Sequence, residues 1–297
     1  MKRTILLSIM MLLISLGGAS AADKTNVVAS TSDLAYFARE IGGGLVDVSF
    51  IAPPSGDIHY VEIRPSYMMK LNKADMALKI GLELDMWMDR IIDGSRNSRL
   101  TVVDCSRYIE PENVPTFEVD ARYGDLHRFG NPHYWLGPQN VGAIVRAISE
   151  GLAEADHANA EIYAANAGRF MKEFEAGLKP LRDKAAALEG LEIVYYHDSW
   201  PYFNTFTGLK AASFMEPYPG VAPSPTHVKE TIDLVKNRQI KVLAVEPYFD
   251  KRIPKKIASE TGARLVTLYP SLGSRDKNET YLQWLEGNLD LLIEAFK

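Results

Sequence analysis

Residues 158–188 read ANAEIYAANAGRFMKEFEAGLKPLRDKAAAL. Ala, Glu and Lys, which favour helix, dominate this stretch. Apolar side chains recur along it at the spacing of one helical face: these are Ile162, Phe170, Phe174, Leu178 and Leu181. Pro180 falls inside the pattern, and we predict that it kinks the helix rather than ends it. The stretch therefore predicts one long helix that joins the two halves of the chain.

On both sides of this helix, short apolar strands alternate with helices. Before it, strands are predicted at 26–30, 46–52 and 78–80, and helices at 33–41 and from Pro65. After it, strands are predicted at 191–196, 242–245 and 265–268, and helices at 226–236, 254–261 and 280–296. This alternation is typical of α/β folds with largely parallel sheets. We therefore predict two α/β lobes with mostly parallel sheets joined by one long helix.

The first residues have the pattern of a secretory signal peptide. Lys2 and Arg3 precede an almost wholly apolar run at 4–16, and Ala19-Ser20-Ala21 supplies the small residues of a cleavage site. No cysteine stands there, so we do not expect a lipid anchor. The predicted organisation is a signal peptide at 1–21, an N-terminal lobe at 22–157, the linking helix at 158–188 and a C-terminal lobe at 189–297. A cleavable signal peptide predicts a periplasmic protein.

Charge and cysteine content exclude several classes of function. The formal net charge is −5, and loss of Lys2 and Arg3 with the leader removes two positive charges to give −7. Without a compensating basic run, this balance argues against a nucleic-acid or anionic-membrane partner. Cys105 is the only cysteine, which excludes a disulfide and a thiolate zinc site. We expect Cys105 to be a small buried hydrophobe.

Three histidines lie at the ends of predicted strands or in the loops after them. His59 lies in GDIHYVE at 56–62, His133 in GNPHYW at 130–135, and His197 in HDSW directly after a strand. Ligands of α/β sheets collect outside the carboxyl ends of the strands, where such loops converge. Three neutral imidazoles and one oxygen form a borderline-soft tetrahedral site that suits zinc. These residues are therefore candidate metal ligands.

Around these histidines the sequence resembles the metal-binding receptors of zinc and manganese ABC importers. The matching motifs are DIHYVEIRPS at 57–66, NPHYWL at 131–136 and YHDSW at 196–200. The resemblance implies two α/β lobes joined by a long helix, with the metal in the interlobe cleft. It also implies a solute-binding protein without enzymatic activity, with zinc as the transported ligand and the membrane permease of an ABC importer as partner. We expect the protein to be a monomer.

The fourth ligand is where the sequence departs from this family. Many relatives carry an Asp just after the last strand, but here 268–273 reads LYPSLG, with no carboxylate before Asp276. Glu246, at the end of the strand at 242–245, is our first candidate, and Pro247 biases it towards an extended backbone. A buried carboxylate that only hydrogen-bonds a neighbouring loop remains an alternative for Glu246. Asp276 and a water molecule are the other candidates for the fourth position.

Other residues near these motifs have secondary roles in this hypothesis. Some relatives carry a His- and acid-rich loop where GDLH occurs at 124–127; His127 is an accessory-ligand candidate, although we favour a solvated loop. Carboxylates often orient ligating imidazoles, and the candidates for this role are Asp57, Asp198 and Glu62. Aromatic side chains are expected to wall the cleft, and these are Tyr134, Trp135 and Trp200.

Two alternatives to a zinc receptor remain at this point. A manganese or iron receptor of the same family is one, although manganese receptors tend to use two histidines and two carboxylates, and three histidines favour zinc. A secreted zinc-dependent hydrolase is the other, because a catalytic zinc keeps an open fourth position. The common signatures His-Glu-x-x-His and Gly-x-Ser-x-Gly do not occur in the sequence, which argues against that class.

Overall fold

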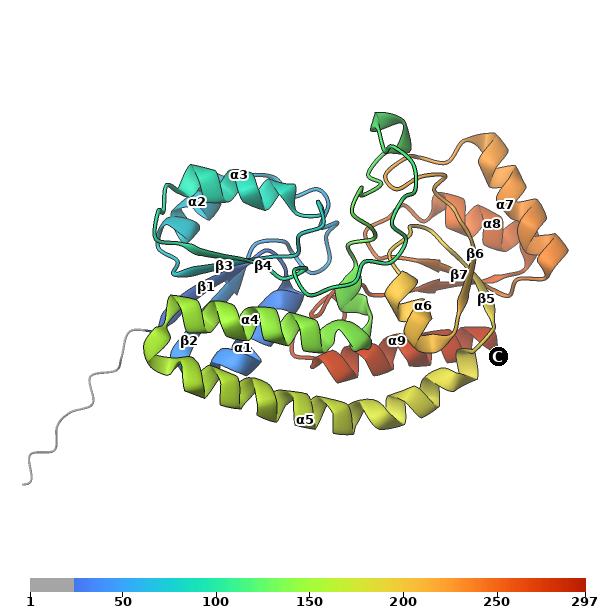
Figure 1. Cartoon of the computed structure of the whole chain (residues 1–297). Helices are drawn as coiled ribbons and strands as arrows, with labels where there is room; N and C mark the ends of the chain where they lie inside the picture. Colours follow the sequence, from blue (N-terminus) through green and yellow to red (C-terminus); the bar gives the residue numbers. More distant parts are fainter. Residues whose placement is uncertain (1–23) are drawn as a thin grey trace, which may run out of the picture.

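The structure is a computed structural model and describes residues 24–297. The N-terminal lobe contains a four-stranded, all-parallel sheet with strand order β2-β1-β3-β4. Its strands are β1 (Thr25–Ala29), β2 (Val46–Phe50), β3 (Met76–Lys79) and β4 (Thr101–Asp104). Helices α2 (Pro65–Asn72) and α3 (Met86–Ser95) lie on one face, and α1 (Ser32–Gly42) and α4 (Val141–Ala155) on the other (Figure 1).

The C-terminal lobe repeats this arrangement with strand order β6-β5-β7-β8, again all parallel. Its strands are β5 (Glu192–Tyr195), β6 (Lys210–Phe214), β7 (Val242–Val245) and β8 (Arg264–Thr267). Its helices are α6 (Pro201–Thr207), α7 (Pro225–Arg238), α8 (Arg252–Thr261) and α9 (Tyr281–Phe296). Alternate residues of β7 face opposite sides: Leu243 packs with the α7 and α8 side, and Ala244 with the α9 side.

Helix α5 (Ala160–Ala185) joins the two lobes and runs on into a short 3-10 turn (Ala186–Leu188). It extends along both lobes in Figure 1, where it lies against α1 and α4 and then against α9. The helix continues through Pro180, as predicted. The sequence pattern predicted that Ile162 would be buried, but Ile162 is 47% exposed. Its neighbour Tyr163 is buried instead.

One hydrophobic core runs beneath both lobes on the side of α5. The ring of Phe37 from α1 lies 5.5 Å from that of Tyr281 on α9, and Phe174 of α5 lies 5.8 Å from the same tyrosine. The Tyr281 hydroxyl donates to the backbone oxygen of Trp135 at 2.7 Å, and Trp135 Nε1 donates to Pro270 O at 2.8 Å. The two lobes are therefore joined by packed side chains as well as by the chain itself.

The predicted fold class is confirmed: two α/β lobes with parallel sheets are joined by one long helix. Cys105 is fully buried and free, as expected. The predicted signal peptide at 1–21 lies outside the described residues. Within residues 24–297, no helix combines the length and the apolar character that crossing a bilayer requires.

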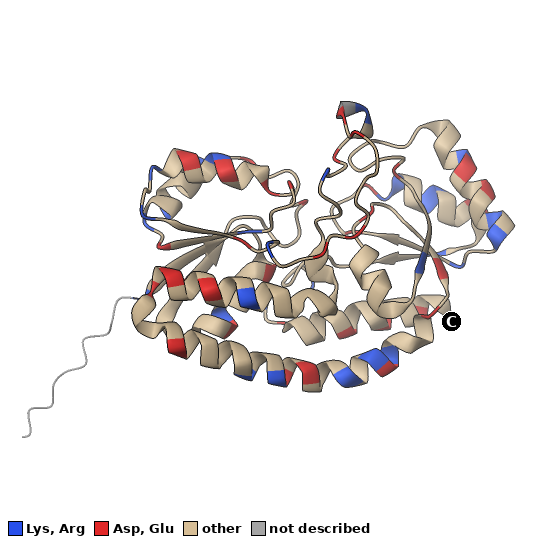
Figure 2. Ribbon diagram, viewed as in Figure 1, with Lys and Arg blue, Asp and Glu red and all other residues tan. Residues whose placement is uncertain are grey.

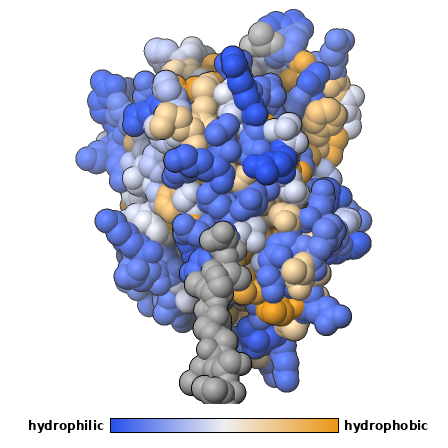
Figure 3. Space-filling model, turned by 90° about the vertical axis from the view of Figure 1, so that its left-hand side faces the viewer, coloured by the Kyte–Doolittle hydropathy of each residue, from blue (hydrophilic) through white to orange (hydrophobic). Residues whose placement is uncertain are grey.

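Acidic and basic residues are interspersed on the outer surfaces of α3, α4, α5 and α7 (Figure 2). At the end of the molecule formed by the N-terminal lobe, the surface is mostly hydrophilic, with hydrophobic side chains in small separate groups (Figure 3). This mixture of charges agrees with the absence of a basic run in the sequence.

Candidate metal centre

Three histidines from both lobes converge between the sheets. One ring nitrogen from each of His59, His133 and His197 lies within 4.8 Å of the other two. The ring centroids are separated by 5.2 Å, 5.2 Å and 5.5 Å. His59 comes from the loop after β2, His133 from the loop before α4, and His197 directly follows the region of β5. The structure therefore brings together the three histidines that the sequence motifs singled out.

Two of these imidazoles, those of His59 and His133, are held by the same local pattern of hydrogen bonds. Asp57 Oδ1 accepts hydrogen bonds from the backbone N–H of His59 at 3.0 Å and from its Nδ1 at 2.9 Å. Asn131 Oδ1 accepts from the backbone N–H and from Nδ1 of His133, both at 3.0 Å. In each loop, an oxygen two residues before the histidine fixes both the backbone and the ring. Such partners orient a ligating imidazole and set its tautomer.

His197 is held by a partner from another part of the C-terminal lobe. Its Nδ1 donates to Glu216 Oε2 at 2.9 Å, and both side chains are buried. Glu216 lies just beyond the end of β6. All three Nδ1 atoms are thus engaged, while Nε2 of His59 and Nε2 of His133 are buried without a hydrogen-bond partner. Unpaired buried nitrogens of this kind are what a bound cation would complete.

Protonation differs sharply between these imidazoles. Burial, followed by the neighbouring imidazoles, holds the pKa of His133 well below its usual value, so its ring is neutral and free to donate a lone pair. Burial opposes the charged form of His197 too, but the nearby Glu216 and Glu246 outweigh it and raise the pKa of His197. For Asp57, burial opposes ionisation, yet the hydrogen bonds from His59 lower the pKa of this carboxyl overall.

Of the three aromatic side chains expected to wall the cleft, Trp135 packs against a histidine of the cluster. Tyr134, Trp135 and Trp200 are almost completely buried. The Trp135 ring lies 5.4 Å from that of His133, and the Tyr134 hydroxyl donates to Ile80 O at 2.8 Å. Hydrogen bonds to backbone oxygens hold the rings of Tyr134 and Trp135 in place, whereas the Trp200 indole donates to the Glu246 side chain.

Glu246 is not brought into the histidine cluster. Among the described residues, the grouped ligand atoms come from the three imidazoles alone. Glu246 is buried at the end of β7, where Trp200 Nε1 donates to its Oε1 at 2.9 Å and its Oε2 has no partner. Burial raises the pKa of Glu246 to about 7. The carboxylate lies close enough to His197 to influence its pKa, but its role as fourth ligand stays a prediction.

Asp276 is also outside the cluster. It is exposed and accepts a hydrogen bond from the backbone N–H of Asn278 at 3.0 Å, within its own turn. This geometry gives Asp276 a local role in shaping the loop before α9.

His127, for which a solvated loop was favoured, instead lies against the cluster. Its ring is stacked on that of His59 with centroids 5.6 Å apart, and its Nε2 is buried without a partner. Burial, with contributions from His59 and His197, lowers the pKa of His127 to about 3. A neutral imidazole therefore faces the site from the segment before His133.

The orienting residues were predicted only in part. Asp57 has the expected role, whereas Glu62 is exposed and pairs with Arg64. Asp198 contributes its backbone oxygen, which accepts from Asn131 Nδ2 at 2.6 Å. Asn131 was missed although it precedes His133 as Asp57 precedes His59. Glu216 was missed because nothing in its local sequence links it to His197, 19 residues away.

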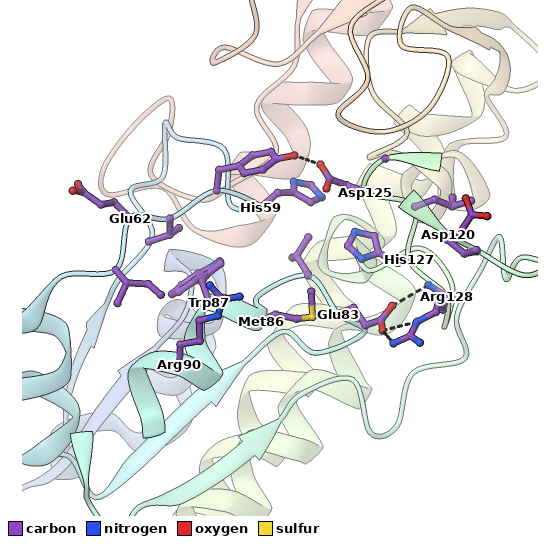
Figure 4. Close-up of a pocket in the computed structure, with 17 residues that line it drawn as sticks. His59, Glu62, Glu83, Met86, Trp87, Arg90, Asp120, Asp125, His127 and Arg128 are labelled. Carbon is purple, nitrogen blue, oxygen red and sulfur yellow. Dashed lines mark hydrogen bonds and ion pairs between the residues drawn. The ribbon is translucent and has the colours of Figure 1, made fainter. Parts of the chain in front are cut away.

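A cleft of about 840 Å³ opens beside the cluster (Figure 4). Both His59 and His127 line it, and their rings lie next to each other in this view. Acidic side chains from both sides line it as well, and these are Glu62, Glu83, Asp120 and Asp125. Arg90 and Arg128 line the cleft too, and Glu62, Glu83 and Asp120 are each paired with an arginine, so the lining has mixed charge.

Comparisons with known proteins agree with this geometry. The sequence pattern of the family described as ZnuA, zinc-uptake complex component A periplasmic, matches residues 27–295. The iron-binding protein YfeA of Yersinia pestis is 25% identical over 283 residues, covering 94% of this chain and 88% of that protein. The manganese-binding lipoprotein MntA of Halalkalibacterium halodurans is 24% identical over 284 residues, covering 94% and 91%.

A crystal structure of ZnuA has the same fold. It superimposes with a TM-score of 0.79 at 26% sequence identity, and the match covers 93% of this chain and all of that one (100%). The likeness thus extends over both lobes and the helix between them.

Proposed function

The chain belongs to the ZnuA family of periplasmic zinc-uptake components, and from that premise we propose that it captures zinc and delivers it to the permease of an ABC importer. Proteins of this family are metal-binding substrate-binding components of ABC transporters and are not enzymes, so the zinc-hydrolase alternative gains no support. What the proposal adds is the identity of the cargo, the ligands that hold it and the place where it is bound.

The observation that supports zinc is the set of donor atoms. The three grouped atoms are all imidazole nitrogens, from His59, His133 and His197. Imidazole suits zinc, whereas manganese is better served by carboxylate and carbonyl oxygens. Relatives are named for iron and for manganese, so the family alone does not identify the metal. The all-imidazole donor set supports zinc over manganese.

Capture follows from the way these rings are prepared. Zinc–nitrogen distances of about 2.0–2.1 Å in a tetrahedral site place ligand nitrogens about 3.4 Å apart. The three nitrogens lie within 4.8 Å of one another, so small ring movements suffice to close on an ion. The hydrogen bonds at Nδ1 already fix the ring planes, which lowers the ordering cost of binding.

The proposal includes export and the import partner. The leader at 1–21 directs the chain to the periplasm and is removed there, and the mature protein acts as a monomer. The loaded protein then docks on the membrane permease and releases its ion to it.

The test is a zinc titration of the mature chain, from residue 22, in competition with a chromophoric chelator. We expect one zinc per chain, and His133→Ala should weaken binding by orders of magnitude because a ligand is lost. His157→Ala is the matched control, since His157 lies in a 3-10 turn between α4 and α5, outside the cluster. Wild-type zinc affinity in His133→Ala, or stronger binding of manganese than of zinc by the native chain, would contradict the proposal.

A further inference from the structure

His127 approaches the three-histidine cluster from a fourth direction. It lies in the bridging segment, residues 119–130, which follows β4 and leads towards His133. Together with His133 and His197, it lines a small cavity of about 20 Å³. A cavity of that size accommodates one water-sized species. His127 also stacks on His59 at 5.6 Å. Its nitrogens stand outside the group of three imidazoles whose ligand atoms lie within 4.8 Å of one another, so its ring has to move inward to reach an ion held by that group.

The Nε2 atom of His127 has no hydrogen-bond partner although it is buried. Unsatisfied buried nitrogens cost free energy and are uncommon in folded proteins. The same condition holds for Nε2 of His59 and of His133. A bound cation would accept the lone pair of each of these three Nε2 atoms. The lack of a partner at His127 Nε2 then has the same explanation as at His59 and His133.

The bridging segment is anchored on both sides of His127. On the side before it, the backbone N–H of Asp125 donates to Pro219 O of the C-terminal lobe at 2.8 Å, and the Tyr60 hydroxyl donates to the Asp125 carboxylate. On the side after it, Arg128 Nε donates to Glu83 Oε1 at 2.9 Å and its backbone N–H to Glu83 Oε2 at 3.1 Å. Figure 4 shows the hydrogen bond to the Asp125 carboxylate and the Glu83–Arg128 contacts on either side of the His127 ring. The imidazole is thus positioned by both lobes.

The backbone of the segment is also suited to this close approach. Gly124 has φ of +62°, and a Cβ atom there would collide with the backbone oxygen of Pro219. Only glycine allows the chain to pass so near the C-terminal lobe in this conformation. The position of His127, three residues later, therefore follows from a built contact rather than from a free loop.

Glu246 is the rival for the fourth position, and its surroundings differ. One of its oxygens is taken by Trp200, and although the other has no partner, Glu246 lines neither the small cavity nor the cleft. Its side-chain contact is the hydrogen bond from the indole of Trp200. Of these two unpartnered groups, His127 is therefore the one that faces the ion-sized space.

We propose that His127 is the fourth zinc ligand, so that the bound ion is held by four imidazoles. This inference rests on the proposed zinc function and deepens it in two ways. An all-nitrogen site disfavours manganese, which prefers oxygen donors. The segment that carries His127 is also held by Tyr60 and Glu83 through Asp125 and Arg128. Binding of the ion by His127 therefore depends on these contacts at the cleft.

X-ray absorption of the zinc-loaded mature protein tests the inference directly, because scattering from imidazole rings counts them. We expect four imidazoles and no carboxylate in the native chain, and three in His127→Ala. His127→Ala should also weaken zinc binding by more than the roughly 10- to 100-fold that loss of an orienting partner costs. Tyr60→Phe, which removes one anchor but keeps the imidazole, should retain four, and His157→Ala should match the native chain.

The outcomes distinguish failure of His127 as a ligand from failure of the proposed zinc-receptor function. Three imidazoles in the native chain, with unchanged zinc affinity in His127→Ala, would overturn the role of His127 while loss of binding in His133→Ala still supported a zinc receptor. Three imidazoles with one carboxylate oxygen that disappears in Glu246→Gln would assign the position to Glu246 instead. If His133→Ala also kept native affinity, the proposed function itself would fall.

Discussion

Glu216 Oε2 lies 2.9 Å from His197 Nδ1, and the two side chains are only 7% and 4% exposed. The carboxylate also accepts a hydrogen bond from the backbone N–H of Gly220 at 3.2 Å. His197 therefore differs from His59 and His133, whose orienting oxygens stand two residues before them in the same loop. Its orientation depends on a buried charge from the next strand.

Replacement of Glu216 should weaken zinc binding without removing a ligand. We expect Glu216→Ala to lower zinc affinity roughly 10- to 100-fold, the range found when an orienting partner of a ligating histidine is lost. Glu216→Gln keeps an acceptor and should cost less. A chelator competition titration measures both, with Glu175→Ala as control because Glu175 is an exposed residue of α5. Equal affinity in all three variants would show that Glu216 does not orient His197.

Zinc binding should release a proton from His197 near neutral pH. The pKa of His197 is raised, so part of the metal-free protein carries a proton that zinc must displace. Affinity should therefore fall as the pH drops from 7.5 to 5, and proton release should shrink as the pH rises above the pKa of His197. Calorimetry in buffers of different ionisation enthalpy measures this release. Flat affinity and no proton release over this range would contradict a site that includes His197.

Glu246→Gln and Asp276→Asn test the two carboxylates considered for the fourth position. With His127 as the fourth ligand, Glu246→Gln should change zinc affinity only modestly, through the field at His197 and the Trp200 hydrogen bond, and Asp276→Asn should have no effect. Competition titrations on both variants measure this. A large loss in Glu246→Gln alone would restore Glu246 as the ligand, and a large loss in Asp276→Asn would require its exposed turn to refold over the site.

Asp33 should make the stability of the metal-free protein depend on pH. Its Oδ1 accepts from the backbone N–H of Leu272 at 2.9 Å, its Oδ2 is buried without a partner, and burial raises its pKa to about 7. Because the folded pKa lies above the unfolded value, the stabilising effect of the proton is complete below about pH 4 and is lost as the pH rises through 7.

Asp33→Asn removes this titration. Relative to the native chain, the variant should gain on the order of 3 kcal/mol in free energy of unfolding between pH 5 and pH 8, at about 1.4 kcal/mol per pH unit up to the folded pKa of about 7. Urea unfolding of both proteins at four pH values measures the difference. A difference that does not change with pH would mean that Asp33 is ionised at its ordinary pKa in the folded protein.

Much of the fold was readable because its elements are strongly patterned. Strand β7 was predicted at its observed bounds, and α5 was recognised from helix-forming composition and an apolar face. Elements α3, β4, α4, α6 and β6 were not predicted. Strand β4 has only one buried residue among its four, and α6 is seven residues long, so neither shows a clear period. Helix α4 contains Gly142 and Gly151, which have low helix propensity and therefore weaken the helical signal in the sequence.

The candidate site divides in the same way. His59, His133 and His197 were found because each stands in a recognisable motif at the end of a strand. His127 and Glu216 reach the site only through the folding of the chain. His127 lies on a segment held between the lobes, and Glu216 follows β6, the strand that pairs with β5, after which His197 lies. Spacing along the sequence carries no signal of either contact. Local motifs thus identify ligands more readily than the groups that position them.

The hydrophobic core that runs through both lobes determines how the molecule comes apart. The α7 and α8 side of the C-terminal lobe has a separate cluster of its own. With Phe37, Phe174 and Tyr281 packed together across α1, α5 and α9, however, the core on the α5 side of each lobe is incomplete without the other lobe. Heating should therefore melt the protein in a single cooperative transition instead of two steps. Amide hydrogens of α5 and α9 should then exchange with solvent at one common rate, and zinc should slow both together although the ion touches neither helix.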